Sequence, residues 1–536
     1  MRPTTMKNVF LKTRLLLATM VAVASLTATA HAAAPGITGP TFNLTAQPAY
    51  LTQPDGQAIY SWGYGCVGTP SGFAPASVTG ATCPTMQVPG PTLIVTEGQT
   101  VTVNLTNNLP TAAGNTSILF PGFAVTSPTG SGVAGLLTTE AAPGGTVTYT
   151  FTASSAGTHS YYSGTQSDLQ IEMGLYGAVI VLPKTPVSGD TACSNDLQAS
   201  NLAAEGHWGE SDYRLASSAY DDKHSCYDRE YLFQFSEMDP NIHIQALAQV
   251  SSAARVTACA SGPTTPGCGL DVPTEPYHPA YFLINGRSMP DDMDPNYAKE
   301  YPHQPYNGNP HMHPGEQVLL RIIGQGRWQH PFHEHANHVR ILARDGNLIL
   351  TPLGTGLAGP ALFTTTTTPG QTMDGIFYFT GRGLNWDMYG HNPASGDALA
   401  KLGCTADANG YNTGDPTALN YWEWCQDHNK PLQAAPFGDV SAGGPVSLPD
   451  PDIFTNGAWY GGSPYLGPDA TTRAVGATGV TPPSGTVANS PSGEAGYAFM
   501  WHSHNEREIT TNNAFPGGMM MMMLIDSREF VIDETN

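Results

Sequence analysis

The residues of this chain best suited to chemistry are histidines in two stretches that lie far apart in the sequence. Residues 330–338 read His-Pro-Phe-His-Glu-His-Ala-Asn-His, and residues 501–506 read Trp-His-Ser-His-Asn-Glu. Each stretch holds a His-x-His pair, and side chains two positions apart on a strand point to the same face. If the strands are neighbours, four imidazoles converge: His333, His335, His502 and His504. Neutral imidazole binds copper, zinc, iron and nickel, so this spacing predicts a metal site.

The alternative is that these are separate surface or core histidines. Two pairs in one chain favour the metal site, because four converging imidazoles cost desolvation free energy without giving much packing.

The elements that must position the pairs are strands. Short β-branched or alternating apolar runs recur along the chain, bounded by Gly, Pro or Asn, and 59 Gly and 45 Pro supply many turns. The sequence therefore predicts an all-β protein built from β-sandwiches. The predicted strands cover residues 92–96, 100–105, 146–151, 158–162, 177–182, 231–235, 280–286, 317–323, 338–350, 371–379, 497–501 and 519–525.

The order of these strands predicts the domain organisation. An N-terminal sandwich occupies residues 41–187, a polar connector follows at 188–228, and a second β region at 229–530 carries both histidine pairs. Within it, residues 381–496 are rich in Gly, Pro, Asn, Asp and Thr, which predicts a long loop-rich insertion able to cover or gate a site. Whether the second region forms one domain or two is left open.

Residues 1–32 have the pattern of a secretory signal peptide, with four cations before an apolar run at 15–24 and small residues around His31. No stretch is apolar for about 18 residues, so no transmembrane helix is expected. We expect an exported protein, periplasmic or extracellular. The net charge of -22 does not suit a polyphosphate partner and argues against nucleic-acid binding.

Eight cysteines in an exported chain predict disulfides. Spacing suggests that neighbours pair, although sequence alone leaves the connectivity open. The suggested pairs are Cys66 with Cys83, Cys193 with Cys226, Cys259 with Cys268, and Cys404 with Cys425.

Two further motifs have a chemical and a structural interpretation. The five methionines at 519–523 could bind Cu(I) through soft thioethers, but packing on a buried strand is the favoured interpretation. The motif His311-Met312-His313 could be a weak copper site, and a solvated turn is the more common alternative.

Several of these segments resemble multicopper oxidases, which are built from cupredoxin domains. Residues 91–103 are similar to the strand pair that opens the first cupredoxin domain, and 173–181 to its last strand. The run 330–335 resembles the family's HPxHxH signature, and 502–504 its terminal HCH signature. The resemblance covers most of 41–380 and 497–525. It implies tandem Greek-key cupredoxin-like sandwiches, copper as cofactor, and oxidoreductase activity.

The resemblance also implies a ligand plan from which this chain departs. The family holds a type 1 copper with the first histidine of HPxHxH, here His330, and with the cysteine of HCH, here Ser503. Glu508 stands where a further histidine is expected. A hydroxyl cannot replace the thiolate of a blue copper centre, so we predict no type 1 copper and no intense blue colour.

The first domain departs as far. Residues 119–121 and 162–164 stand where the family has two further His-x-His pairs, so four of the eight histidines of the trinuclear cluster are missing. A full cluster cannot form within this chain unless His159 or a neighbouring chain contributes.

What is left is a four-histidine site for copper, with His330 as a further candidate ligand. Glu506 and Glu508 are candidates to orient a histidine or relay a proton, or they are ordinary surface carboxylates. His338 and His391 are weaker candidates, because neither belongs to a His-x-His pair.

Three functions compete at this point. The first is an exported copper oxidoreductase that binds dioxygen or takes electrons from a small phenol or metal ion. The second is a copper-handling protein without turnover, and the third is a structural scaffold with a vestigial site. The substrate and the oligomeric state are not readable from the sequence.

Overall fold

The structure is a computed structural model that describes residues 34–187, 210–313, 315–379, 405, 462–466, 487–488, 495–526 and 531–532. The predicted signal peptide, Cys193, Cys404, Cys425, His391 and most of the insertion at 381–496 lie outside the described residues.

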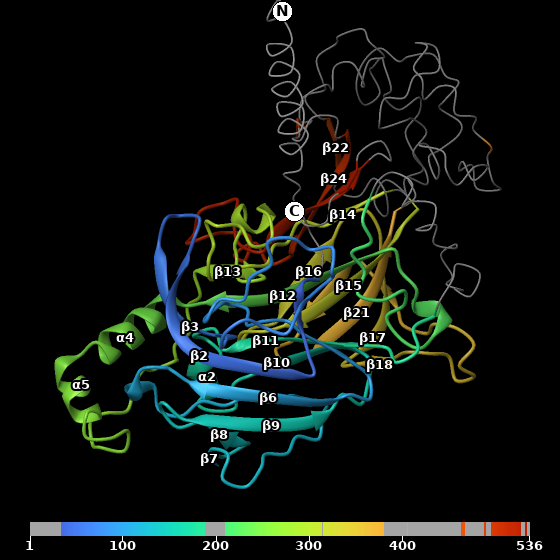
Figure 1. Cartoon of the computed structure of the whole chain (residues 1–536). Coiled ribbons are helices and arrows are strands. Elements are labelled where there is room, and N and C mark those ends of the chain that lie inside the picture. The colour runs from blue at the N-terminus through green and yellow to red at the C-terminus, as the bar shows by residue number, and fades with distance from the viewer. Residues whose placement is uncertain are drawn as a thin grey trace, which may run out of the picture.

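Two facing sheets form the first half of the chain, coloured blue to cyan in Figure 1. Alternation explains how they pack: along β6 and β9 every second side chain is buried, and Val103 and Tyr149 meet in the core between the sheets. One sheet has the order β10-β11-β5-β1-β4, with bounds Gly157–Tyr162, Tyr176–Leu182, Leu93–Thr96, Gly36–Thr38 and Phe73–Ala74. The other has the order β3-β2-β6-β9, with bounds Ala58–Cys66, Thr41–Thr52, Thr100–Asn107 and Thr146–Thr152.

The second half repeats the arrangement with two larger sheets, green to red in Figure 1. Their core includes Phe235, Phe332 and Trp501. One sheet has the order β13-β12-β15-β21-β17-β18, with bounds Tyr281–Ile284, Arg229–Met238, Gln317–Gly324, Thr372–Tyr378, Val339–Arg344 and Asn347–Leu348; β19 (Ala361–Leu362) pairs with β17. The other has the order β14-β25-β24-β16-β20, with bounds His311–Met312, Met520–Asp526, Ala495–Ser503, His330–Glu334 and Thr364–Thr367; β22 (Gly462–Leu466) pairs with β24, and β23 (Val487–Ala488) with β22.

These paired sheets confirm the predicted all-β class and its tandem β-sandwiches. The domain boundaries at 41–187, 188–228 and 229–530 stay a prediction. Short elements complete the fold: β7 (Val133–Ala134) pairs with β8 (Thr139–Glu140), and α2 (Ser167–Gln170) precedes β11.

Two helices were not expected from the sequence. α4 (Pro240–Val250) and α5 (Ala253–Cys259) project from one side of the molecule (Figure 1). α4 begins where the Asp239 side chain accepts a hydrogen bond from the Asn241 amide, with proline in the first turn. Its Ile242 and Ala246 pack into the core of the first half, which explains why a short helix is held there.

A buried polar contact fixes the two halves against each other. Thr158 on β10 donates from its backbone amide and its hydroxyl to the two carboxylate oxygens of Asp374 on β21, at 3.1 and 2.5 Å. Arg321 on β15 donates to Glu230 at 2.8 Å and lies 3.8 Å from Asp374. All these groups are buried, so the contact sets the orientation of the halves.

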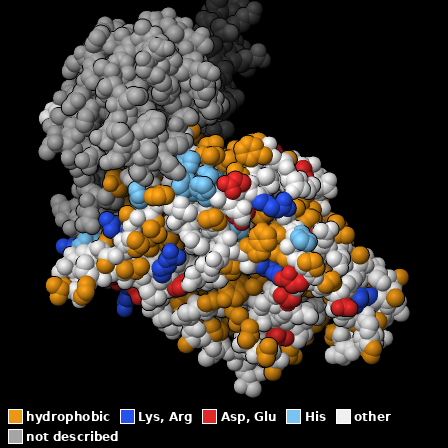
Figure 2. Space-filling view, turned by 180° about the vertical axis from the view of Figure 1, so that it is seen from behind, with side chains coloured by type: hydrophobic (Ala, Val, Ile, Leu, Met, Phe, Trp, Pro, Cys, Tyr) orange, Lys and Arg blue, Asp and Glu red, His pale blue; other side chains and the backbone are white. Residues whose placement is uncertain are grey.

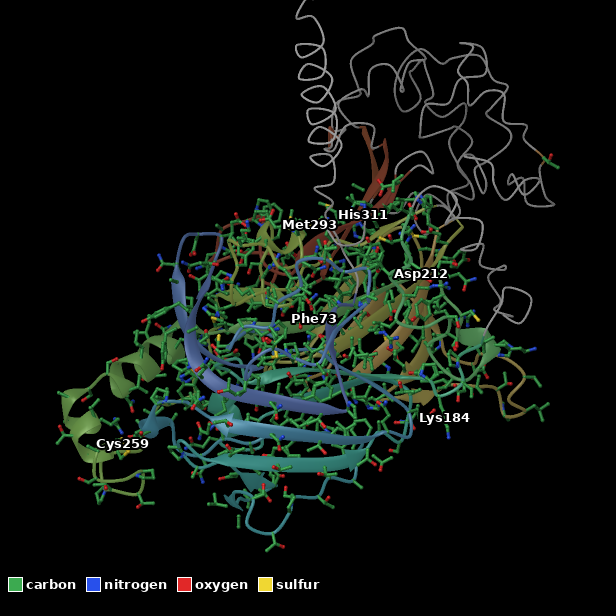
Figure 3. All side chains as sticks on the ribbon, in the orientation of Figure 1. Phe73, Lys184, Asp212, Cys259, Met293 and His311 are labelled. Carbon is green, nitrogen blue, oxygen red and sulfur yellow. A yellow bond between two sulfur atoms is a disulfide. The ribbon has the colours of Figure 1, made fainter. Side chains whose placement is uncertain are left out.

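Two predicted disulfides are confirmed, Cys66–Cys83 and Cys259–Cys268, the second tying the end of α5 to the loop after it (Figure 3). Cys226 is also disulfide-bonded, and its predicted partner Cys193 lies outside the described residues. Among the helices of the described residues, none has the length and apolar character needed to span a membrane.

Candidate metal centre

The two histidine pairs come together because β16 and β24 are hydrogen-bonded neighbours. They run antiparallel, and His333 is directly opposite His502. Residues directly opposite on antiparallel strands share a face, with Cβ atoms about 4.5–5.5 Å apart. His335 and His504 each lie two residues further along their own strand, so in the antiparallel pair they flank the His333–His502 pair from opposite sides.

The four imidazoles form one cluster. The ring centroid of His333 lies 4.9 Å from that of His335, 5.5 Å from that of His502 and 4.8 Å from that of His504. His335 and His502 are 5.1 Å apart by the same measure, and their Nε2 atoms approach to 3.2 Å. These are distances at which several ring nitrogens can reach one metal ion or a close pair of ions.

The surroundings favour the neutral form of His333 and His502. Burial, followed by the neighbouring imidazoles, lowers the pKa of His333 to about 4, and burial also lowers the pKa of His502. His502 Nδ1 lies 2.7 Å from the Ser503 carbonyl oxygen, which can only accept, so Nδ1 carries the proton and the Nε2 lone pair faces His335. A neutral imidazole whose lone pair faces a neighbouring ring is a donor that fits copper.

The cluster lies at the edge of the protein. His333, His335 and His502 are buried, whereas His504 is exposed. Figure 2 shows histidine side chains gathered at the surface beside hydrophobic ones. Phe363, 42% exposed, contacts the rings of both His333 and His338, at 5.7 and 5.0 Å between centroids. The weaker candidate His338 therefore lies beside the cluster, and Phe363 contacts both His338 and His333.

His330 is not in the cluster, and its predicted role as a metal ligand is revised. Its Nδ1 lies 2.9 Å from Glu508 Oε2 and its Nε2 lies 2.9 Å from Glu237 Oε2. Burial alone would lower its pKa, but the two carboxylates outweigh it and raise the pKa to about 9. His330 is thus a buried imidazolium between two carboxylates, and neither nitrogen has a lone pair to offer a metal.

Ser503 and Glu508 complete this arrangement. The Ser503 hydroxyl donates to Glu508 Oε2 at 2.5 Å, and Asn505 donates to Glu508 Oε1 at 2.9 Å. The sequence proposed Glu508 as a partner for a ligating histidine, but the residue that it orients is His330. Glu506 is exposed, and its charge acts on His502 by raising that residue's pKa against the effect of burial.

The network continues inward through residues that the sequence analysis missed. Glu237 accepts hydrogen bonds from the backbone amides of Arg327 and Trp328, at 2.7 and 2.9 Å. The Tyr277 hydroxyl donates to Glu172 Oε2 at 2.6 Å and lies 3.3 Å from Glu237 Oε1. Burial and then these carboxylates raise the pKa of Tyr277 well above its usual value. The local signal was Glu237 itself, a carboxylate near the end of the strand β12 (Arg229–Met238).

The first half offers no histidine pair at the positions where the resemblance placed them. Leu119 and Tyr162 form a β-bridge, so the two stretches do lie side by side. Phe120 packs into the first core, and His159 packs against Phe123 with a ring separation of 4.6 Å. Neither stretch supplies an imidazole, and the ring of Phe120 belongs to the hydrophobic core.

The His311-Met312-His313 motif is not a histidine pair facing a common ion. His311 Nδ1 lies 2.7 Å from Asp526, and His313 Nε2 lies 2.8 Å from Glu210. Glu210 and Glu316 bring carboxylate oxygens near His313, but both are also paired with the guanidinium of Arg229. A cation already pairs with both carboxylates, so we assign the group a structural role.

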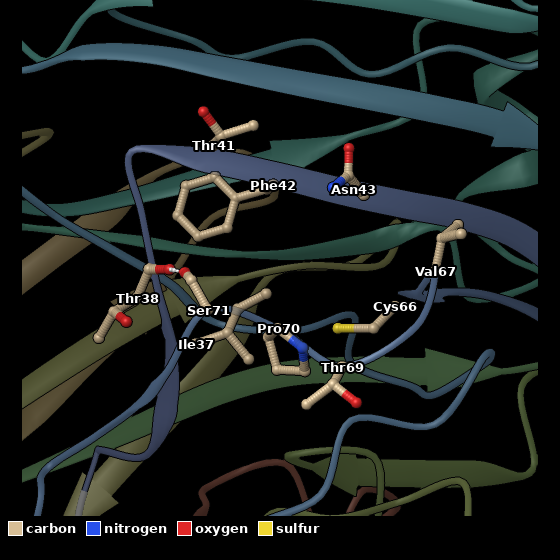
Figure 4. A pocket seen from close by; sticks show the side chains of 10 residues that line it. All are labelled: Ile37, Thr38, Thr41, Phe42, Asn43, Cys66, Val67, Thr69, Pro70 and Ser71. Atoms are coloured by element: carbon tan, nitrogen blue, oxygen red, sulfur yellow. Dashed lines mark hydrogen bonds between the residues drawn. The ribbon is translucent and has the colours of Figure 1, made fainter.

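A pocket of about 300 Å³ lies in the first half, between the start of β2 and the loop after Cys66 (Figure 4). Phe42, Asn43, Val67 and Pro70 are among its lining residues. Neither sheet of that half carries the histidine pairs, so the pocket is not part of the candidate centre.

Comparisons with known proteins bear on the ancestry of the chain. The family model described as multicopper oxidase matches residues 76–186. The multicopper oxidase MCE of Talaromyces pinophilus is 36% identical over 124 residues, which are 22% of this chain and 20% of that protein. Copper resistance protein A of Pseudomonas syringae pv. tomato is 35% identical over 119 residues, 22% of this chain and 19% of that protein. The matched stretches thus span about a fifth of these relatives' length.

Among solved structures, the blue copper oxidase from Nitrosomonas europaea superposes with a TM-score of 0.44 and 16% identity, covering 90% of this chain and 85% of that one. The family match at 76–186 lies in the half without the histidine pairs. The candidate centre therefore rests on its own geometry.

Proposed function

Because this chain is a divergent member of the multicopper oxidase family, we propose that its C-terminal half binds copper through His333, His335, His502 and His504 and acts as a copper oxidoreductase. The observation that carries the proposal is the 3.2 Å approach of His335 Nε2 to His502 Nε2 inside a cluster of four rings. Ring nitrogens at this separation are placed to share a metal.

The residues around the cluster have definable roles in this proposal. The Ser503 carbonyl orients His502, and Thr364 Oγ1, at 2.6 Å from His333 Nδ1, orients His333. Exposed His504 and half-exposed Phe363 lie where a small reductant would approach. Bound copper would supply one-electron chemistry between that reductant and dioxygen.

The reductant class follows from the absence of a type 1 copper ligand set at Ser503 and His330. With serine at position 503 there is no thiolate, and the imidazolium of His330 fills the place of a second copper. Electrons then have to enter directly at the histidine cluster. We therefore propose a small phenol or a reduced metal ion that can reach the exposed edge. Export through the segment 1–32 to a periplasmic or extracellular location belongs to the same proposal.

A copper-handling protein without turnover is the second candidate function. The observation that favours it is the Glu237–His330–Glu508 arrangement, in which carboxylates occupy both ring nitrogens of His330 and leave neither for a substrate-oxidising copper. This candidate keeps the same four ligands and differs only in the absence of turnover.

The test uses the full chain, reconstituted with copper, and measures bound copper, the EPR signal and oxygen uptake with a phenol or Fe(II). The variant His502→Ala/His504→Ala should lose copper, whereas His278→Ala, which removes an exposed histidine elsewhere, should not. Bound copper with oxygen uptake supports the oxidoreductase, and bound copper without it supports copper handling. If wild type binds no copper, both fail and the scaffold hypothesis stands.

A further inference from the structure

Methionines lie beside the histidines on one face of the sheet β14-β25-β24-β16-β20. In the pairing of β24 with β25, Met520 is directly opposite His502, and Met522 is directly opposite Met500. Opposite residues share a face, and residues two apart on one strand share it as well. Three thioethers therefore follow His502 along what we call the histidine face: Met500, Met520 and Met522.

The rest of the methionine run points the other way. Met519, Met521 and Met523 are fully buried in the second core, with Phe332 and Trp501. The hydrophobic clusters formed by the described residues include none of the histidine-face methionines. The packing predicted from the sequence thus accounts for alternate methionines of the run only.

The histidine-face methionines are close enough to one another to act together. Directly opposite Cβ atoms are about 5 Å apart, and diagonal neighbours, here Met500 and Met520, about 7–8 Å, which long side chains span. Met520 is 4% exposed, while Met500 and Met522 are only half-buried, so an ion can reach them. A fourth thioether lies at the strand's edge, because Met293 Sδ accepts a hydrogen bond from the Met522 amide at 3.4 Å. Figure 3 labels Met293 and His311. His311 lies on β14, the strand that pairs with β25.

We propose that Met500, Met520 and Met522 form a Cu(I)-binding site that passes the ion to His502. Thioethers are soft, uncharged donors that select Cu(I), whereas imidazoles bind both copper oxidation states. Methionine is also unbranched and flexible, so three such residues can converge on one ion. Valine or isoleucine would suit a strand that only packs. Transfer is a ligand exchange from sulfur to nitrogen and changes no oxidation state.

The inference rests on the proposed function for the destination of the ion, but not for the existence of the thioether site. The chain supplies a matched pair of variants. Met520→Leu/Met522→Leu removes two thioethers from the histidine face, and Met521→Leu/Met523→Leu removes two from the core face of the same strand. Both lose equal numbers of sulfur atoms from adjacent positions.

The experiment is an anaerobic Cu(I) titration of the full chain against a chromophoric Cu(I) chelator, with folding checked by circular dichroism. It is run with the native histidines and with His502→Ala/His504→Ala. We expect the histidine-face variant to lose at least about tenfold in Cu(I) affinity in both backgrounds. Mutating residues that only contact the ligands of a metal already lowers its affinity by about tenfold or more. The core-face variant should stay within about twofold of its parent, because its sulfur atoms are not ligands.

Equal effects of the two methionine variants would overturn the inference, as would a wild-type chain that takes no Cu(I) from the chelator. Should a variant fail to fold, Ag(I) binding to the wild type, followed by sulfur-edge X-ray absorption, decides whether thioethers are the ligands. If Cu(II) binding proves independent of His502 and His504, the proposed function fails; the Cu(I) result still decides the methionine site separately.

Discussion

Glu508 Oε2 lies 2.9 Å from His330 Nδ1, although the two residues are 178 positions apart in the sequence. The carboxylate is hydrogen-bonded to the residue that the family resemblance assigned to a type 1 copper, and it also accepts a hydrogen bond from the Ser503 hydroxyl. A charged hydrogen-bonded group therefore lies at the position where the family holds that copper, which agrees with the prediction that this chain has no type 1 copper.

Glu508→Gln should destabilise the protein, because it removes a carboxylate from a buried imidazolium. We expect a loss of about 1.5–3 kcal/mol in the free energy of unfolding, the usual contribution of a hydrogen bond to a charged group. Denaturant unfolding measures it. The matched change at exposed Glu506, Glu506→Gln, should stay within about 0.5 kcal/mol. Equal effects at the two positions would contradict the assignment.

Stability should also depend on the protonation of His330. Its pKa is raised from 6.5 to about 9 in the folded protein, so the folded state holds this proton more tightly than the unfolded state. The resulting stabilisation is complete below about pH 6.5 and is lost as the pH rises through about 9. Unfolding measured between pH 6 and 10 should show this decline, and His330→Asn should reduce it. An unchanged decline in that variant would place its origin in another group.

Copper content should separate His330 from the four clustered histidines. His330→Asn should keep the copper stoichiometry of the wild type, because both of its nitrogens bind carboxylates. His333→Asn should lower the stoichiometry, because this ring is central to the cluster. Metal analysis after dialysis of both variants provides the measurement. Loss of copper in His330→Asn, with its fold intact, would restore the ligand role that the sequence first suggested.

Restoring a thiolate should not be enough to create a blue centre. In Ser503→Cys, Glu508 still occupies His330 Nδ1, so we expect no intense thiolate-to-copper band. The double variant Ser503→Cys/Glu508→His frees His330 Nδ1 from the carboxylate and supplies a second imidazole. The thiolate-to-copper band should therefore appear in this variant. Absorption spectra of the two copper-loaded variants test this. A blue single variant would show that the Glu508–His330 contact does not block metal binding.

The sequence predicted those features that local periodicity controls. Alternation along β6 and β9 located both strands, and the His-x-His spacing anticipated that His333 and His502 would share a face. The helices α4 and α5 were missed, because α4 is held by Ile242 and Ala246 packing on a distant sheet. The disulfides Cys66–Cys83 and Cys259–Cys268 were predictable, because each closes a short loop.

The role of His330 could not be read from its neighbours, because Glu508 and Glu237 decide it from 178 and 93 positions away. Tyr277 and Glu172 belong to the same network for the same reason: their contact crosses 105 positions. The methionine run was divided between two faces only when the register of β25 with β24 was known.

The most direct test of the account is the copper content and absorption spectrum of the copper-reconstituted full chain, beside His502→Ala/His504→Ala. The account predicts one or two coppers per wild-type chain bound by four imidazoles, without an intense blue band, and loss of that copper in the variant. A strong blue band in the wild type, or Cu(II) that stays bound after both histidines are removed, would contradict it.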